Sequence, residues 1–197
     1  MRNLIGTLLL CGAMLGATNG ARAGTASGEL RFDMERSNFG FELSTRWGQK
    51  LVGRFPRFDG KVVALADGRQ QVQLRMYTRD VEIVGHPRYS EWARGDRFFG
   101  AQTWPAVVFV SRPYDPETIK RGGPLAGELN IRGIARPETL IVQPAACERA
   151  GLDCDVVVIG AVRRSDYDMG AFGLAVNDRV VFVLRSRLRE APAESVP

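Results

Sequence analysis

The sequence has little of the side-chain chemistry from which most active sites are built. It contains one histidine, His86, and three cysteines among 197 residues. Serine hydrolases place a histidine beside a nucleophile, often in a Gly-x-Ser-x-Gly turn, and this turn is missing, as are phosphate loops and dinucleotide-binding fingerprints. His86 precedes Pro87 without further ligands nearby, so we interpret it as a turn residue and expect no metal site.

A long amphipathic helix is also missing. Apolar and polar residues instead alternate in six segments: 30–35, 39–43, 72–76, 128–132, 156–162 and 180–187. Because successive side chains of a strand point to opposite faces, each segment has one apolar face. With no helical layer to cover these faces, the sheet must curl and bury them itself. We expect an all-β barrel of about eight strands, one of them (51–65) bent at Pro56, with one short helix near residues 88–94.

The N-terminal residues are typical of a secretory signal peptide. A basic start precedes the apolar run 4–17, which is short for a membrane span, and Ala21-Arg22-Ala23 provides a cleavage site. We expect residues 1–23 to be removed and residues 24–197 to form one periplasmic or secreted domain without a transmembrane segment. A cytosolic protein with an apolar N-terminus is the alternative. A lipid anchor at Cys11 is disfavoured because Leu10 stands where a small residue is required.

Two cysteines remain after this cleavage, Cys147 and Cys154, separated by six residues. In an oxidising compartment they are expected to form a disulfide that closes a loop. In the chain-entropy model this closure stabilises the fold by roughly 2.5 kcal/mol. A metal site would need more ligands, and a redox pair is normally spaced as Cys-x-x-Cys.

The charge of the expected mature domain is modest. It has 25 basic and 22 acidic residues, a net charge of +3, and the basic residues are mostly arginines spread along the strands. A nucleic-acid-binding protein would gather them on one face with interleaved aromatic residues. We therefore expect no nucleic-acid partner, whereas a homodimer is left open.

Aromatic residues are the positive signal for function. Ten of them fall on or beside strand segments: Phe39, Phe41, Phe55, Phe58, Phe98, Phe99, Trp104, Phe109, Tyr167 and Phe172. They suit either a packed core or an elongated apolar cavity. The parity of the alternating segments directs one set of side chains into one continuous cavity along the barrel axis, namely Phe41, Leu43, Phe55, Leu74, Met76, Phe109, Leu129 and Ile131.

Several short motifs follow one another in a recognisable order: Phe39-x-Phe41, Val52 to Gly60, Arg97-Phe98-Phe99, Trp104-Pro105, Val108 to Ser111, Gly127 to Pro137, and Arg164-Ser165-Asp166-Tyr167. This order resembles the YceI-like family of exported, lipocalin-like polyisoprenoid-binding proteins. The resemblance extends from about Gly28 to Leu188. The sequence departs from the family pattern at Asp168, where many members carry glycine, and at Trp92 to Gly95, where many carry a histidine-leucine pair.

The resemblance implies an extended eight-stranded antiparallel barrel with a deep apolar pore for a long-chain lipid, such as a quinone tail or a polyprenyl chain, and no catalytic residues or further cofactor. The expected ligand-binding residues are Phe39, Phe41, Leu43, Phe55, Leu74, Met76, Phe99, Trp104, Phe109, Leu129, Ile131, Tyr167 and Met169. Arg163 and Arg164 are candidates for a polar or pyrophosphate head group, because guanidinium groups match phosphate oxygens, and the alternative is that they are surface arginines at the end of a strand. Two alternatives stay open: a hydrolase of a lipid-linked substrate, and a packed barrel that protects against stress through surface partners.

Overall fold

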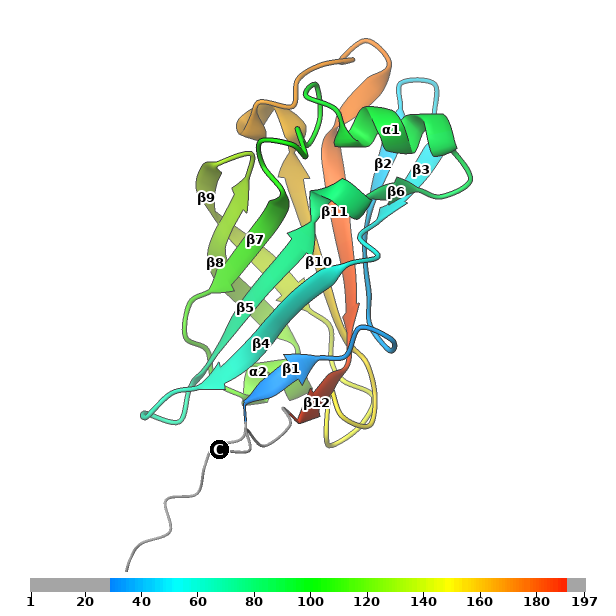
Figure 1. The fold of residues 1–197 in the computed structure, drawn as a ribbon. Coiled ribbons are helices and arrows are strands. Elements are labelled where there is room, and N and C mark those ends of the chain that lie inside the picture. The colour runs from blue at the N-terminus through cyan, green and yellow to red at the C-terminus, as the bar shows by residue number, and fades with distance from the viewer. Residues whose placement is uncertain (1–28, 191–197) are drawn as a thin grey trace, which may run out of the picture.

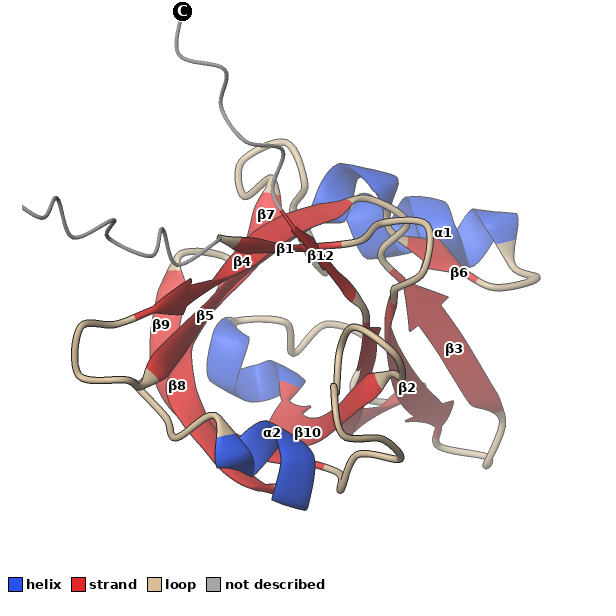
Figure 2. Cartoon of the chain, turned by 90° about the horizontal axis from the view of Figure 1, so that it is seen from below, coloured by secondary structure: helices blue, strands red, loops and turns tan. Residues whose placement is uncertain are grey.

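The structure, a computed structural model, describes residues 29–190, most of which belong to one antiparallel sheet that curls around its apolar face (Figures 1 and 2). The strands are β1 (Leu30–Phe32), β2 (Asn38–Thr45), β3 (Lys50–Arg54), β4 (Phe58–Ala64), β5 (Gln70–Tyr77), β6 (Glu82–Ile83), β7 (Ala106–Ser111), β8 (Gly123–Ile131), β9 (Ile134–Val142), β10 (Val156–Arg163), β11 (Val176–Ser186) and β12 (Leu188–Glu190). Their order in the sheet is β12-β1-β4-β5-β7-β8-β9-β10-β11-β2-β3-β6.

The expected all-β, antiparallel architecture is confirmed, but the expectation of a closed, eight-stranded barrel is wrong. The described residues form a twelve-stranded half-barrel whose sheet order ends at β12 and β6, which do not pair with each other. The segment expected to be one strand bent at Pro56 forms two strands in different parts of the sheet. β3 pairs with β2 and β6, whereas β4 pairs with β1 and β5. Proline has no backbone N–H to donate to a neighbouring strand, so the chain leaves the sheet at Pro56, between β3 and β4. The last long strand is likewise divided at Arg187 into β11 and β12, and β12 pairs with β1.

The expected short helix is present as α1 (Pro87–Arg94), with proline at its first position. The expectation of a single helix is wrong, since the five-residue helix α2 (Glu117–Arg121) and the 3₁₀ turns η1 (Thr78–Asp80) and η2 (Arg164–Tyr167) are also present. Figure 1 shows α1 and the β2–β3 turn at the upper end of the molecule and α2 at the lower end. The two helices therefore flank opposite ends of the curled sheet.

The core lies inside the curled sheet and is built from the apolar side chains that alternate along each strand. In β3, Leu51 and Gly53 are buried while their neighbours are exposed. Position 53 requires glycine because its partner on β2 is Phe41, and a Cβ atom at position 53 would lie 2.1 Å from the Phe41 ring. The ring of Phe41 therefore lies against the wall of the sheet.

The predicted signal peptide, residues 1–23, lies outside the described residues. Within residues 29–190, no helix has the length and apolar character needed to cross a membrane.

Candidate ligand-binding interior

Two largely apolar cavities lie inside the curled sheet. Residues of α1 line one cavity and residues of α2 line the other, and Figure 1 shows these two helices at opposite ends of the molecule. The upper chamber, next to α1, has a volume of about 200 Å³, and the lower chamber, next to α2, about 360 Å³. No residue lines both chambers, so the single continuous cavity expected from the sequence is divided. An apolar cavity of roughly 150 Å³ is already large enough to stay dry and bind benzene. Each chamber can therefore hold an apolar group.

Aromatic rings lie at the boundary of the two chambers, because Phe41 and Phe99 line the upper one and Phe39 lines the lower one. Phe41, Phe55 and Phe99 form an upper layer, with ring centroids 5.5 to 5.9 Å apart. Phe39 and Phe58 form a lower layer, with centroids 4.3 Å apart. Phe39 and Phe41 are two residues apart on the inward face of β2, so the two layers are adjacent. We call these five residues the aromatic partition.

A row of stacked rings lies at the mouth of the upper chamber. His86, Tyr89 and Trp92 follow one another at a spacing of three residues, which places them on one side of α1, and their rings stack at 5.0 and 5.2 Å. The row continues from Trp92 to Phe172 at 6.1 Å and from Phe172 to Phe98 at 5.6 Å. All of these except His86 line the chamber. Stacking on Tyr89 therefore explains the position of the His86 ring, which does not line the chamber.

Arg164 is the one charged residue that lines the upper chamber, and its guanidinium is buried. Its Nη1 donates to the carbonyl oxygens of Met169 and Ala171 at 2.6 and 3.1 Å, its Nε to Asn177 at 3.1 Å and its Nη2 to Val176 at 3.3 Å. Burial lowers the pKa of this guanidinium from its ordinary value. Arg164 thus holds the segment 169–177 against the chamber. Arg163, next to it, is exposed on the opposite face of β10.

Arg132 holds the other loops around the upper chamber. Its guanidinium lies 4.5 Å from the Trp104 ring, donates to the carbonyl oxygens of Asp96 and Phe98 at 2.6 Å, and pairs with Asp168 at 3.1 Å. Asp168 has a φ of 54° and a ψ of 36°, in the left-handed region that glycine, asparagine and aspartate adopt most readily. This conformation explains how aspartate is accommodated where the family pattern has glycine, and the carboxylate adds an ion pair.

The lower chamber is lined by inward-facing residues of β5, β7 and β10 and by polar residues at its rim, where Lys120 of α2 forms an ion pair with Glu148. Leu74 and Phe109 face each other across the β5–β7 pairing. Tyr114 also lines this chamber, and burial raises the pKa of its hydroxyl to about 12. The interior of the chamber is apolar and its charges lie at its entrance.

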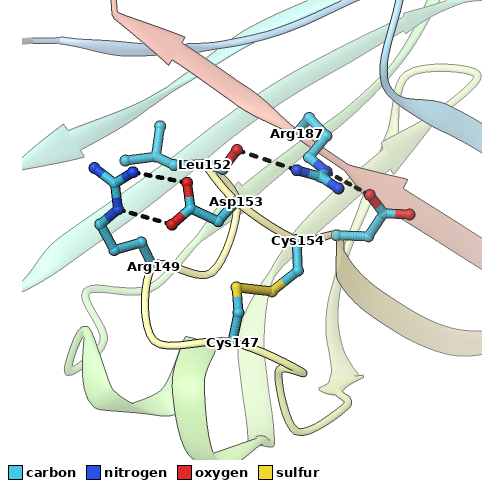
Figure 3. The surroundings of a disulfide bond; sticks show 7 residues. Cys147, Arg149, Leu152, Asp153, Cys154 and Arg187 are labelled. Carbon is cyan, nitrogen blue, oxygen red and sulfur yellow. Dashed lines mark hydrogen bonds and ion pairs between the residues drawn. A yellow bond between two sulfur atoms is a disulfide. The ribbon is translucent and has the colours of Figure 1, made fainter.

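A disulfide between Cys147 and Cys154, as expected from the sequence, closes the loop below the lower chamber (Figure 3). Arg149 pairs with Asp153 across this loop at 2.8 Å. Arg187, between β11 and β12, donates to the Leu152 carbonyl oxygen at 3.1 Å and pairs with Asp155. These contacts fix the loop to the sheet and place Leu152 in the chamber wall.

The structure distributes the residues expected to bind the ligand over three regions. The upper chamber is lined by Phe41, Leu43, Phe99, Ile131 and Met169, and the lower chamber by Phe39, Leu74 and Phe109. Phe55, Met76, Leu129 and Tyr167 are buried but line neither chamber, and Trp104 supports Arg132. The Tyr167 hydroxyl donates to Glu138 at 2.9 Å, and burial, assisted by this bond, raises its pKa.

Three aromatic residues that are not among the predicted ligand-binding residues also line the upper chamber: Trp47, Tyr89 and Trp92. The spacing of residues 86, 89 and 92 was the available signal, because aromatic residues three apart share one side of a helix. Within residues 29–190, no group of three histidine, cysteine, aspartate or glutamate side chains is placed to hold a metal ion.

Comparison with known proteins gives this architecture a family. The model of the YceI-like domain matches residues 30–187, and the chain belongs to the YceI-like family. No curated protein is significantly similar to it in sequence.

Solved structures share the fold. BcnA of Burkholderia cenocepacia superimposes with a TM-score of 0.65 at 19% identity, over 80% of this chain and 99% of BcnA. A polyisoprenoid-binding domain from Saccharophagus degradans gives 0.60 at 15% identity, over 83% and 98% of the two chains. The YceI protein of Campylobacter jejuni gives 0.53 at 16% identity, over 71% and 84%. At these identities the likeness establishes the fold.

Proposed function

We propose that this protein binds a long-chain apolar ligand, such as a polyisoprenoid, a quinone tail or a fatty-acid-like lipid, inside its curled sheet. The observation that carries the proposal is the pair of apolar chambers aligned along the interior. Membership of the YceI-like family and the polyisoprenoid-binding relative support the same ligand class. Burial of apolar surface, at roughly 25 cal/mol per Å², would supply the affinity. Loss of rotamer freedom in a flexible chain would offset part of it.

The two chambers suggest how such a ligand is held. A chain longer than one chamber must pass the aromatic partition, whose rings would have to turn to admit it. The loop bound by Arg164 closes one side of the upper chamber, and the disulfide loop closes the lower one. The ligand would then exchange through an end of the sheet and not through its wall.

We favour binding over hydrolysis because the polar side chains that line the upper chamber provide no nucleophile paired with a base. They are Thr45, Gln49, Tyr89 and Arg164, beside the indole groups of Trp47 and Trp92, and the Arg164 guanidinium already donates to four backbone carbonyl oxygens. In the described part of the chain, a head group would therefore meet an arginine whose donors are largely occupied.

We further propose that residues 1–23 direct export and that the domain functions in the periplasm or outside the cell. The Cys147–Cys154 disulfide supports this, because disulfides persist in oxidising compartments. The mass of the protein recovered from its own host tests it. We expect a chain that begins at Gly24, and a cytosolic chain that retains residue 1 would contradict export.

The ligand is tested by native mass spectrometry and organic extraction of the protein purified from its host. Val180→Phe should fill the upper chamber and Val158→Phe the lower one, since both valines line these spaces. Val110→Phe adds the same volume to the exposed face of β7 and is the matched control. We expect loss of co-purified lipid in the first two variants only, with circular dichroism spectra unchanged. A wild-type protein without lipid, or folded chamber variants that keep it, would contradict the proposal.

A further inference from the structure

Exposed apolar side chains gather at the mouth of the upper chamber. Nine large apolar residues are exposed within residues 29–190, and four of them lie on the three segments that border this mouth. Leu174 is 95% exposed, Trp47 70%, Trp92 50% and Phe172 39%. They come from three separate segments: the β2–β3 turn, α1 and the loop 168–175. Three of the four also line the chamber, so the exposed apolar surface is continuous with the interior.

The contacts between these segments make the apolar end a defined surface. Arg46, next to Trp47, donates from Nε to the Gly173 carbonyl oxygen at 3.0 Å and joins the β2–β3 turn to the loop that carries Leu174. The stacking of Trp92 on Phe172 joins α1 to the same loop. Trp47 and Leu174 therefore project from a supported rim.

Basic side chains surround this rim. The exposed basic residues are Arg46 on the β2–β3 turn, Lys50 at the start of β3, Arg88 on α1 and Arg97 after α1. None of them forms an ion pair within residues 29–190. Of the carboxylates on and beside these segments, Asp168 is paired with Arg132 and Asp178 accepts hydrogen bonds from Ser165, whereas Glu91, Asp96 and Asp166 form no ion pair within residues 29–190. Four exposed cations thus lie with two exposed, unpaired carboxylates on the β2–β3 turn, the start of β3, α1 and the residues that follow α1.

We propose that this end of the protein docks on the surface of an anionic phospholipid bilayer, with Trp47 and Leu174 inserted and the upper chamber opening onto the membrane. Tryptophan favours the interfacial region of a bilayer, and lysine and arginine near the surface are attracted to anionic head groups. A single inserted side chain or cation binds weakly, so the combination of both signals is what makes docking effective.

A membrane fits this surface better than a protein partner. The apolar side chains project singly from two turns and a helix, with cations between them, as in interfacial membrane-binding elements. The surface also surrounds the opening of an apolar cavity, so a lipid could move between bilayer and chamber without crossing water. Docking itself requires no ligand in the chamber, so membrane binding is a property separate from the proposed function.

The test is sedimentation of the purified protein with vesicles of phosphatidylcholine that contain phosphatidylglycerol, compared with vesicles of phosphatidylcholine alone. Both lack isoprenoids, so a failure of the proposed function does not affect the result. We expect binding to the anionic vesicles that weakens with added salt. The double variant Trp47→Ser/Leu174→Ser should bind about 100-fold more weakly, about tenfold for each side chain. Arg46→Gln/Lys50→Gln should lose the preference for anionic lipid.

The matched control is Met34→Ser/Ile141→Ser, which removes two exposed apolar side chains away from the rim and should bind like the wild type. Three results would overturn the proposal: no binding of the wild type to anionic vesicles at low salt, an equal loss in the control, or a dimer that the Trp47→Ser/Leu174→Ser variant dissociates while vesicles bind neither protein. The last result would assign the surface to a second copy of the chain. Circular dichroism establishes that each variant is folded.

Discussion

Truncation of Phe41 tests whether the aromatic partition limits the length of the bound chain. Phe41 is buried, forms part of the wall of the upper chamber, and has its ring 5.5 Å from Phe55, 5.9 Å from Phe99 and 6.4 Å from Phe182. Phe41→Ala removes this ring from the boundary between the chambers. The upper chamber should then extend towards Phe39, and the variant should retain longer apolar chains than the wild type.

The magnitude follows from the environment of the ring. Phe→Ala in a core typically costs 3 to 5 kcal/mol, and part of this cost arises from the loss of aromatic pairs, each of about 0.5 to 1.5 kcal/mol. We expect the free energy of unfolding of the lipid-free protein to fall by about 3 kcal/mol, because Phe41 already borders a cavity and fewer contacts are lost than in a solid core. A stability of 5 to 15 kcal/mol, typical of a domain, leaves the variant folded.

Two measurements check this prediction: urea denaturation of the lipid-free protein, and mass spectrometry of lipids extracted after exposure to a mixture of chain lengths. A bound ligand should restore part of the lost stability, since ligands that bind only the native state stabilise it. Val81→Ala is the control, because Val81 is fully buried and lines neither chamber. An unchanged chain-length distribution in a folded Phe41→Ala variant would refute the role of the partition.

Three further changes test the supports of the two chambers. Cys154→Ser should lower the free energy of unfolding by about 2.5 kcal/mol in the chain-entropy model, measured by urea denaturation, and wild-type protein unfolded without reductant should show no free thiol. The raised pKa of Tyr114, about 12 against an ordinary 10, means that its contribution to stability is complete below pH 10 and is lost as the pH rises towards 12; Tyr114→Phe should remove this alkaline loss of about 2 to 3 kcal/mol, while an identical pH profile would contradict the assignment. Arg164→Lys cannot reproduce the fan of donors, so stability should fall by about 3 kcal/mol and amide exchange in residues 169–177 should accelerate; unchanged exchange would show that this loop is held by other contacts.

Alternation of apolar and polar residues predicted most strands because it depends only on which face of the sheet is buried. It could not predict that residues 51–65 belong to two strands, because the apolar pattern does not show that the chain leaves the sheet between β3 and β4. Helix α2 has five residues and no buried side chain, so no apolar pattern marked it. Asp168 could not be interpreted because its left-handed conformation becomes visible only in three dimensions.

The alternation of side chains along a strand also predicts which residues of the candidate site point inward. Arg163 and Arg164 are both candidates for the head group in the sequence analysis. Alternation after the buried Val162 directs Arg163 outward and Arg164 inward, and the structure has Arg163 exposed and Arg164 buried. Parity does not report depth along the axis, so it could not separate the upper chamber from the lower one. It also could not show that Leu129, although buried, lines neither the upper chamber nor the lower one.

The positions of glycine on the wall explain how one pattern of inward side chains leaves space at both ends. A glycine in the wall leaves room for a neighbouring ring to lie against the wall, and the ring then takes less of the volume of the chamber that it borders. A Cβ atom at Gly53 would meet Phe41 at 2.1 Å, and one at Gly127 would meet Phe109 at 2.6 Å. The rings of Phe41 and Phe109 thus occupy space that the side chain of any larger residue at position 53 or 127 would fill. Since Phe41 borders the upper chamber and Phe109 the lower one, these two wall glycines contribute to the volume available to a ligand as directly as the apolar residues that would touch it.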